Sequence, residues 1–216
     1  MIPLRIENSI SSVYKDGMIK VTKTTIKTTL PPAISAVFLD RDGVINRDSP
    51  DYIRCWDDFE FLPRSIAAIA RLTRAGIRVI VITNQSIVGR GWVPQEVLAD
   101  THTRMCAAVE AGGGQIAAIY HCPHHPDDGC ACRKPRPGMI LRAAADHDIA
   151  LARTVMIGDS AKDIACARNA GCGRAVLVQT GDYPKAAAAL SSLGITPDRV
   201  ARDLWDAVDG LLADKG

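Results

Sequence analysis

Two aspartates separated by one residue are the first feature of this sequence that could do chemistry. They lie in Asp40-Arg41-Asp42-Gly43, directly after the short apolar run 36–39. Carboxylate oxygens are hard ligands, so such a pair can hold a cation such as Mg²⁺ and leave one oxygen free to attack an electrophile. Aspartate and glycine also fill ordinary turns, so the pattern gains weight only from other residues that meet it.

A cluster of neutral hydrogen-bond donors follows a second apolar run. Residues 77–82 are apolar except for Arg78 and lead into Thr83-Asn84-Gln85-Ser86. Hydroxyl and amide groups at the end of a strand suit the oxygens of a phosphoryl group. We therefore expect this cluster to bind substrate if it meets the aspartate pair.

A third carboxylate follows the apolar run 154–157, in Gly158-Asp159-Ser160. The glycine allows a sharp turn that would direct Asp159 into the same cleft as Asp40. Capping of the following helix by Asp159 or Ser160 would explain the residues equally well. The role of Asp163 stays open, because stabilisation of the helix dipole in the first turn would be sufficient reason for it.

Three cations lie within four residues, in Arg133-Lys134-Pro135-Arg136. Two prolines restrict the backbone of segment 133–138. Arg133, Lys134 and Arg136 could therefore bind a phosphate as a group instead of being mobile in solvent. A solvated basic loop would have a similar composition. The order of the four motifs along the chain, each at or near a predicted strand end, favours one shared phosphate site.

The segment 122–132 has the spacing of a metal site. Cys122 and His124 are followed after five residues by Cys130 and Cys132. Three thiolates and one imidazole complete a tetrahedral zinc site with no open position, and a turn at 127–129 would bring the two halves together. The sequence alone leaves His125 and His121 as rival ligands to His124. We expect the remaining cysteines to be ordinary packed side chains.

These candidate residues need a scaffold that brings strand ends together. From residue 33 onward, apolar strands alternate with helical segments; the strands are expected at 36–39, 77–82, 116–120, 154–157 and 174–178, and the helices at 65–75, 94–111, 138–147, 161–170 and 197–213. This alternation predicts an α/β fold, a doubly wound (Rossmann-like) parallel sheet with a small zinc-binding loop inserted. Ligands of such sheets bind at the carboxyl ends of the strands.

Residues 1–32 differ in composition from the rest. They hold five basic and two acidic residues and end in Pro31-Pro32. We expect an N-terminal extension, with 22–29 as a possible hairpin or edge strand, followed by one domain over 33–216.

Composition excludes several function classes. The chain has 216 residues, a net charge of +2 and 47% hydrophobic residues, as in an ordinary globular enzyme. Neither nucleic-acid binding nor a membrane span is expected, because no basic bias and no long apolar run is present. Without a secretory signal, the expected location is the cytoplasm, and we expect a monomer.

The four ordered motifs resemble those of the haloacid dehalogenase (HAD) superfamily of phosphotransferases, over about residues 36–180. The resemblance implies that Asp40 is the nucleophile, that Asp42 is the general acid and then base, and that Thr83 binds the transferring phosphoryl group. It also implies that Lys134 neutralises that group. Asp159 would hold Mg²⁺ with the Asp40 carboxylate and the Asp42 backbone carbonyl.

With the cysteine-rich loop added, the sequence is similar to the D-glycero-D-manno-heptose 1,7-bisphosphate 7-phosphatases. The segments that carry this likeness are FLDRDGVIN, TNQS, CPHHPDDGCACRKPRPGM and GDSAKD. The resemblance implies a sugar phosphate substrate, Arg133 on its phosphate, Asn84 near the sugar, and a place in nucleotide-activated heptose synthesis. Ile87 stands where that family usually has glycine. Histidinol-phosphate phosphatases share the loop, and they or another phosphatase of small phosphomonoesters remain the alternative. A non-catalytic zinc module would be expected to lack Asp40, Asp42 or Lys134.

Overall fold

The computed structural model describes residues 14–15, 18–19 and 34–213. The chain divides into two units, Met1–Pro32 and Ala33–Gly216. In the first unit, β1 (Tyr14–Lys15) and β2 (Met18–Ile19) pair as antiparallel strands. The strand or hairpin predicted at 22–29 lies outside the described residues.

The second unit is built on one six-stranded sheet with the order β5-β4-β3-β6-β7-β8. All neighbouring strands in it run parallel. The strands are β3 (Ala36–Leu39), β4 (Arg78–Asn84), β5 (Ala118–Cys122), β6 (Thr154–Gly158), β7 (Arg174–Val178) and β8 (Arg199–Ala201). The predicted parallel α/β fold is therefore confirmed.

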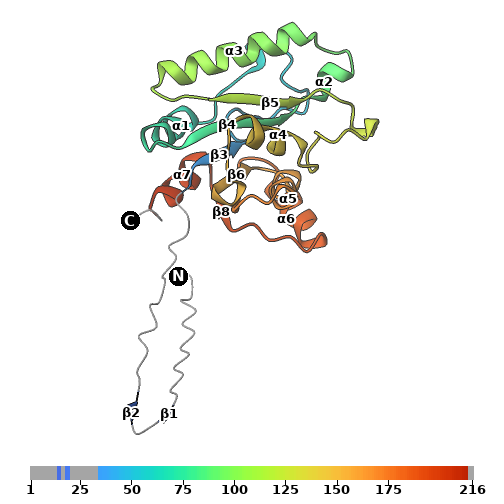
Figure 1. Ribbon diagram of the computed structural model, residues 1–216. Helices are drawn as coiled ribbons and strands as arrows, with labels where there is room; N and C mark the ends of the chain where they lie inside the picture. The colour runs from blue at the N-terminus through green and yellow to red at the C-terminus, as the bar shows by residue number, and fades with distance from the viewer. Residues whose placement is uncertain (1–13, 16–17, 20–33, 214–216) are drawn as a thin grey trace. The chain divides into compact units, whose positions relative to one another are not determined.

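Helices cover both faces of this sheet, as Figure 1 shows. One apolar layer joins Val37 and Leu39 to α1 (Ser65–Arg74), α3 (Gln95–Ala111) and α7 (Leu204–Ala213). The other joins Phe38 to α4 (Gly138–Asp146), α5 (Ala161–Ala170) and α6 (Tyr183–Ser192). Because successive strand residues point to opposite faces, strands buried on both sides read as unbroken apolar runs.

Several observed elements differ from the predicted ones. The single helix expected over 197–213 is wrong: β8 occupies Arg199–Ala201 and α7 begins only at Leu204. A three-residue edge strand has too little periodicity to be distinguished from a helix start. Helix α6 and the four-residue α2 (Ser86–Gly89) were not predicted, and the strand expected at 116–120 begins two residues later, at Ala118.

The strand order places a switch point beside β3. From β3 the chain proceeds outward through β4 and β5, then returns to the other side of β3 as β6 and continues to β7 and β8. A crevice forms at the carboxyl ends of the two strands where the order reverses. Asp40 follows β3 and Asp159 follows β6, so both lie at this point.

Candidate active site

A cavity of about 410 Å³ opens at the carboxyl ends of β3, β4 and β6. It brings together all the residues that the sequence assigned to catalysis, Mg²⁺ or substrate: Asp40, Asp42, Thr83, Asn84, Arg133, Lys134 and Asp159. These residues come from four separate stretches of chain. Their convergence supports the interpretation of the four motifs as one site.

Lys134 is the electrostatic centre of this cavity. Its Nζ atom lies 2.8 Å from Asp40 Oδ2 and 2.6 Å from Asp163 Oδ1, and it donates a 2.9 Å hydrogen bond to the Ile82 carbonyl. All three ammonium protons therefore have acceptors. Burial disfavours the charged form, but the carboxylates of Asp163 and Asp40 more than offset it and raise the pKa of Lys134. Lys134 is thus a fixed positive charge.

Asp163, whose role the sequence left open, serves two functions at once. Its Oδ2 atom accepts hydrogen bonds from the Ser160 amide at 3.0 Å and from the Ser160 hydroxyl at 2.6 Å, which caps α5. Its Oδ1 atom meets Lys134, and the side chain is fully buried. The cap therefore also fixes the lysine that faces Asp40.

The carboxylates of Asp40, Asp159 and Asp163 offer oxygen atoms within 4.8 Å of one another. Burial raises the pKa of Asp40 well above its ordinary value, and Asp163 and Asp159 add to the rise while Lys134 opposes it. One lysine does not neutralise three close carboxylates, so the group carries excess negative charge. This donor set fits a hard divalent cation that would bind oxygen atoms and supply the missing positive charge.

Two glycines make room for the Asp159 carboxylate. A Cβ atom at Gly43 would lie 2.2 Å from Asp159 Oδ2, and one at Gly181 would lie 2.1 Å from the same atom. Gly43 also has a φ of +77°, which other residues rarely adopt. Burial, followed by the charge of Asp163, raises the pKa of Asp159 to about 7. Asp159 is therefore confined in a tight pocket where a cation would favour its ionised form.

The carboxylate of Asp42 faces a different set of partners. It accepts hydrogen bonds from Arg41 Nη2 at 2.8 Å, from Asn46 Nδ2 at 2.9 Å and from Gln85 Nε2 at 2.8 Å. Burial raises its pKa, but the Arg41 charge and these donors together hold the pKa below its ordinary value. Asp42 is hence ionised here, ready to accept a proton.

A second layer of residues supports Asp42. The guanidinium of Arg41 is buried, and its Nη1 atom lies 3.3 Å from His102 Nε2 on α3. Burial, then the charges of Arg41 and His121, lowers the pKa of His102 to about 3, so the ring is neutral and accepts this hydrogen bond. Sequence reasoning did not find Arg41 or His102, and it placed Gln85 only within the donor cluster 83–86, not as a partner of Asp42.

The Asn84 side chain binds both the backbone amide and the backbone carbonyl of Lys134. Its Oδ1 atom accepts from the Lys134 amide at 3.1 Å, and its Nδ2 atom donates to the Lys134 carbonyl at 3.3 Å. Thr83 accepts from Gln85 Nε2 at 2.9 Å, which leaves its own hydroxyl proton for another acceptor. Asn84 thus positions the lysine, while Thr83 keeps a donor for the cavity.

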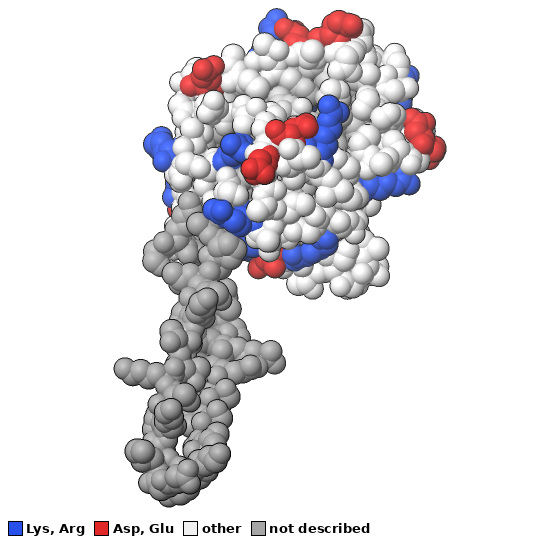
Figure 2. Space-filling model, viewed as in Figure 1, with Lys and Arg blue, Asp and Glu red and all other residues white. Residues whose placement is uncertain are grey.

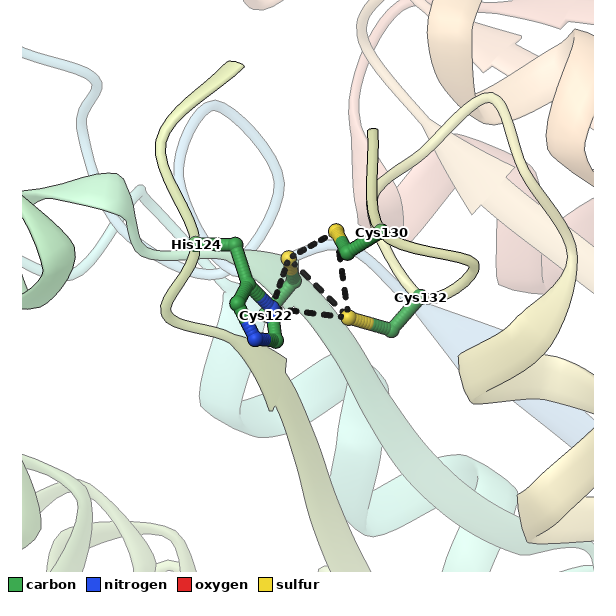
Figure 3. Close-up of side chains that lie close together, drawn as sticks. All are labelled: Cys122, His124, Cys130 and Cys132. Atoms are coloured by element: carbon green, nitrogen blue, oxygen red, sulfur yellow. Dashed lines mark hydrogen bonds between the residues drawn. The ribbon is translucent and has the colours of Figure 1, made fainter. Parts of the chain in front are cut away.

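The cysteine-rich loop brings its four predicted ligands together. Figure 3 shows Cys122, His124, Cys130 and Cys132 pointing toward one another. Cys132 Sγ lies 3.2 Å from Cys122 Sγ, 3.5 Å from Cys130 Sγ and 3.2 Å from His124 Nδ1. The edges of a tetrahedron with bonds of about 2.3 Å measure roughly 3.8 Å, so the group fits a zinc ion after a small expansion. All four cysteine and histidine positions match the spacing argument.

The two rival histidines have other partners. His125 Nδ1 accepts a 3.3 Å hydrogen bond from the Asp127 amide and caps the short helical turn Pro126–Asp128. His121 Nε2 lies 3.1 Å from Gln95 Nε2 at the start of α3. Among the described residues, the ligand group therefore contains His124 and neither His125 nor His121.

Arg136, which the sequence analysis included in a possible phosphate clamp, has a different partner. Its Nη1 atom donates a 2.6 Å hydrogen bond to the carbonyl of Cys130, and the residue does not line the cavity. Arg136 therefore fastens the cysteine-rich loop to the segment that carries Lys134. The active-site cavity is also lined by residues that the sequence analysis did not assign to it, among them Asp48, Tyr52, Arg90 and Lys162.

Charges outside the cavity are mixed. Figure 2 shows basic and acidic side chains interspersed over the face in view, which agrees with the net charge of +2. No helix of the described residues is both long and apolar enough to cross a membrane.

Comparison with known proteins supports the same family. Residues 131–207 match the HAD-hydrolase-like family. The D-glycero-β-D-manno-heptose-1,7-bisphosphate 7-phosphatase of Bordetella bronchiseptica is 44% identical over 178 residues, which are 82% of this chain and 97% of that protein. The protein of the same name from Pseudomonas aeruginosa is 47% identical over 147 residues, which are 68% of this chain and 82% of that one.

Solved structures agree. The crystal structure of the B. bronchiseptica D,D-heptose 1,7-bisphosphate phosphatase, complexed with magnesium and phosphate, matches 84% of this chain and 99% of its own with a TM-score of 0.78 at 42% identity. The corresponding structure from Burkholderia thailandensis matches 83% of this chain and 99% of its own with a TM-score of 0.63 at 34% identity.

Proposed function

Because the chain belongs to the D-glycero-D-manno-heptose 1,7-bisphosphate 7-phosphatase family of HAD-like hydrolases, we propose that it removes the C7 phosphate of this sugar bisphosphate. The names of its relatives specify the β anomer, and the proposal adopts it. The observation that carries the proposal is the meeting of Asp40, Lys134 and Thr83 at one cavity. This set supplies a nucleophile, a fixed cation and a hydrogen-bond donor.

The first step is attack of an Asp40 carboxylate oxygen on phosphorus. The bond from phosphorus to the C7 oxygen breaks, and that oxygen takes a proton from Asp42. Asp42 must be protonated for this, although the Arg41 charge holds its pKa low in the free protein. An incoming phosphate dianion raises the pKa of a neighbouring carboxyl group, so substrate binding favours the required form.

The second step is hydrolysis of the aspartyl-phosphate. Asp42, now ionised and held by Asn46 and Gln85, takes a proton from a water molecule. The hydroxide formed attacks phosphorus, releases inorganic phosphate and returns Asp40 to its carboxylate form. One group serves as acid and then as base, which requires a carboxyl whose pKa depends on the occupant of the site.

Two metals belong to the proposal. Mg²⁺ would be held by the carboxylates of Asp40 and Asp159 and the Asp42 carbonyl, and it would offset the repulsion between phosphate and carboxylate. The magnesium in the B. bronchiseptica crystal structure supports this assignment. Zn²⁺ would be held by Cys122, His124, Cys130 and Cys132, and it would fix the loop that leads into Arg133 and Lys134. We further propose a monomer in the cytoplasm.

The test is phosphate release from the β-heptose 1,7-bisphosphate with Mg²⁺ present, with the remaining phosphate located by NMR. We expect the 1-phosphate as product, and a loss of about 10²- to 10⁴-fold in kcat for Asp42→Asn. Histidinol phosphate, the substrate of the alternative family, serves as the competing substrate. Equal or higher kcat/KM with histidinol phosphate would contradict the substrate assignment but not the phosphatase chemistry. Light scattering of the same preparation measures the oligomeric state.

A further inference from the structure

Gln85 is a buried side chain that contacts two of the residues assigned to catalysis and substrate binding. It is 3% exposed and directly follows β4. Its Nε2 atom donates to Asp42 Oδ2 at 2.8 Å and to Thr83 Oγ1 at 2.9 Å. An ionised carboxylate can only accept hydrogen bonds, so the atom that faces Asp42 must be the amide nitrogen. Both amide protons are therefore used, and the orientation of the side chain is fixed.

Gln85 holds Asp42 in a way that its other donors do not. Arg41 and Asn46 belong to the same short segment as Asp42, so they would move with it if that segment shifted. Gln85 donates instead from the end of β4, the strand that also carries Thr83. It therefore fixes the Asp42 carboxylate relative to the hydroxyl that would bind the phosphoryl group. The distance between the proton donor and the reacting group depends on this contact.

The backbone of Gln85 is held in turn by the cysteine-rich loop. Its amide donates a 2.8 Å hydrogen bond to the carbonyl of Cys122, the last residue of β5. The sulfur of the same cysteine belongs to the ligand group, 3.2 Å from Cys132 Sγ. At the end of α2, the Gly89 amide donates a 2.9 Å hydrogen bond to the Pro123 carbonyl, and a Cβ atom at Gly89 would lie 2.4 Å from that oxygen. Both ends of the segment 85–89 are thus tied to the residues that begin the loop.

We infer that Gln85 is a positioning residue that connects the cysteine-rich loop to the acid/base carboxylate of Asp42. The inference rests on the proposed function and extends it. A shift of the loop displaces the Cys122 carbonyl, then the Gln85 backbone, and with it the amide that holds Asp42. Proton transfer to the leaving oxygen depends on the place of that carboxylate, and a misplacement of about 1 Å lowers the rate by roughly 100-fold. The loop therefore supports Asp42 through Gln85, in addition to the segment that carries Lys134.

The leaving group distinguishes this role from a purely structural one. In the full chain with Mg²⁺ present, Gln85→Met keeps the length of the side chain but removes the donor. It should lower kcat/KM with heptose 1,7-bisphosphate, an alkyl ester, by roughly 10- to 100-fold. The loss with p-nitrophenyl phosphate should be several times smaller, because nitrophenolate leaves without a proton from Asp42. Gln95→Met, at an exposed glutamine that begins α3 outside the cavity, is the matched control and should change neither value.

Two further variants test the contact and the connection separately. Gln85→Glu has nearly the same shape but sets a second carboxylate against Asp42, so its loss with the heptose ester should exceed that of Gln85→Met. Gln85→Met and Cys132→Ser should be coupled if the loop acts through Gln85. The double variant should then lose less kcat/KM than the product of the two separate losses.

The possible outcomes separate this role from the proposed function. Equal losses with the alkyl and aryl esters, in both Gln85 variants, would overturn the positioning of Asp42 by Gln85. Losses that multiply in the double variant would overturn the connection to the cysteine-rich loop. In both cases the phosphatase assignment stands. A wild-type protein inactive with heptose 1,7-bisphosphate would instead overturn the proposed function, and the role of Gln85 with it.

Discussion

The carboxylate group of the cavity and the cysteine-rich loop are both sets of close metal-ligand atoms, but they are built in opposite ways. Asp40, Asp159 and Asp163 come from opposite halves of the chain and are held by buried strands and a capped helix. The loop ligands lie within eleven residues, and three of the four are partly or fully exposed. The carboxylate group is therefore distant in sequence and buried, whereas the loop group is close in sequence and largely exposed.

This difference shows what holds each site in place. The carboxylates are positioned by the sheet core and by Lys134, so their arrangement is a property of the fold. Cys122, Cys130 and Cys132 touch the apolar core on one side, but residues 126–129 and 131 between them are exposed, and a bound ion would supply the constraint that this part of the loop lacks. The carboxylate site should consequently keep its arrangement of side chains when its metal is removed, whereas the cysteine-rich loop should lose its arrangement.

The largest effect is expected from Asp40→Asn. The nearly isosteric change removes the proposed nucleophile, so turnover should fall by at least about 10⁴-fold. The fold and the zinc content should stay unchanged, because the sheet and not Asp40 positions its neighbours. Phosphate-release kinetics, circular dichroism and elemental analysis measure the three quantities. Appreciable residual activity would show that Asp40 is not the nucleophile.

A change at the loop should produce the converse result. Cys132→Ser removes a proposed zinc ligand, and we expect zinc to fall well below one ion per chain. Tm should be lower and kcat/KM roughly ten-fold lower, because the loop no longer holds Arg133 and Lys134 in place. Cys106→Ser, at a half-buried cysteine on α3 outside the group, is the matched control. Wild-type protein purified without chelators and found free of zinc would contradict the assignment of the metal.

The same contrast explains what sequence could predict. The cysteine-rich loop was predictable as a ligand group because local spacing carries its geometry, although the sequence left His125 and His121 as rivals to His124. Asp40, Thr83, Lys134 and Asp159 were predictable as a set, because strand ends in a parallel sheet meet. The partner of Arg136 was not, since it depends on how the cysteine-rich loop folds back against the segment that follows it. The helix dipole and the capping of α5 gave no hint that Asp163 also holds Lys134.

A smaller effect is expected at His102, which supports the cavity from α3. Its pKa is lowered from 6.5 to about 3 in the folded protein, so below pH 6.5 the unfolded state binds more protons. The stability that depends on neutral His102 is present above pH 6.5 and is lost as the pH falls toward 3. Urea unfolding should therefore show the wild type losing about 2 to 3 kcal/mol more than His102→Gln between about pH 6.5 and about pH 4.5. Parallel curves for the two proteins would exclude this role of His102.

The smallest effect is expected from removal of residues 1–32. Every residue of both sites lies in the unit Ala33–Gly216, so kcat/KM and zinc content should stay within about two-fold of the full chain. Steady-state kinetics on the shortened protein measures this. A folded but inactive product would mean that the extension contributes to the site and that the boundary at residue 33 is misplaced.

The three filled hydrogen bonds of Lys134 have a practical consequence for chemical labelling. Reagents that acylate amines react with the neutral form, and the carboxylates around Lys134 keep it charged and enclosed. The other two lysines between residues 34 and 213, Lys162 and Lys185, are exposed and have ordinary access to solvent. Amine-directed dyes and resins should therefore modify Lys185 and Lys162, which lines the cavity, and leave Lys134 intact.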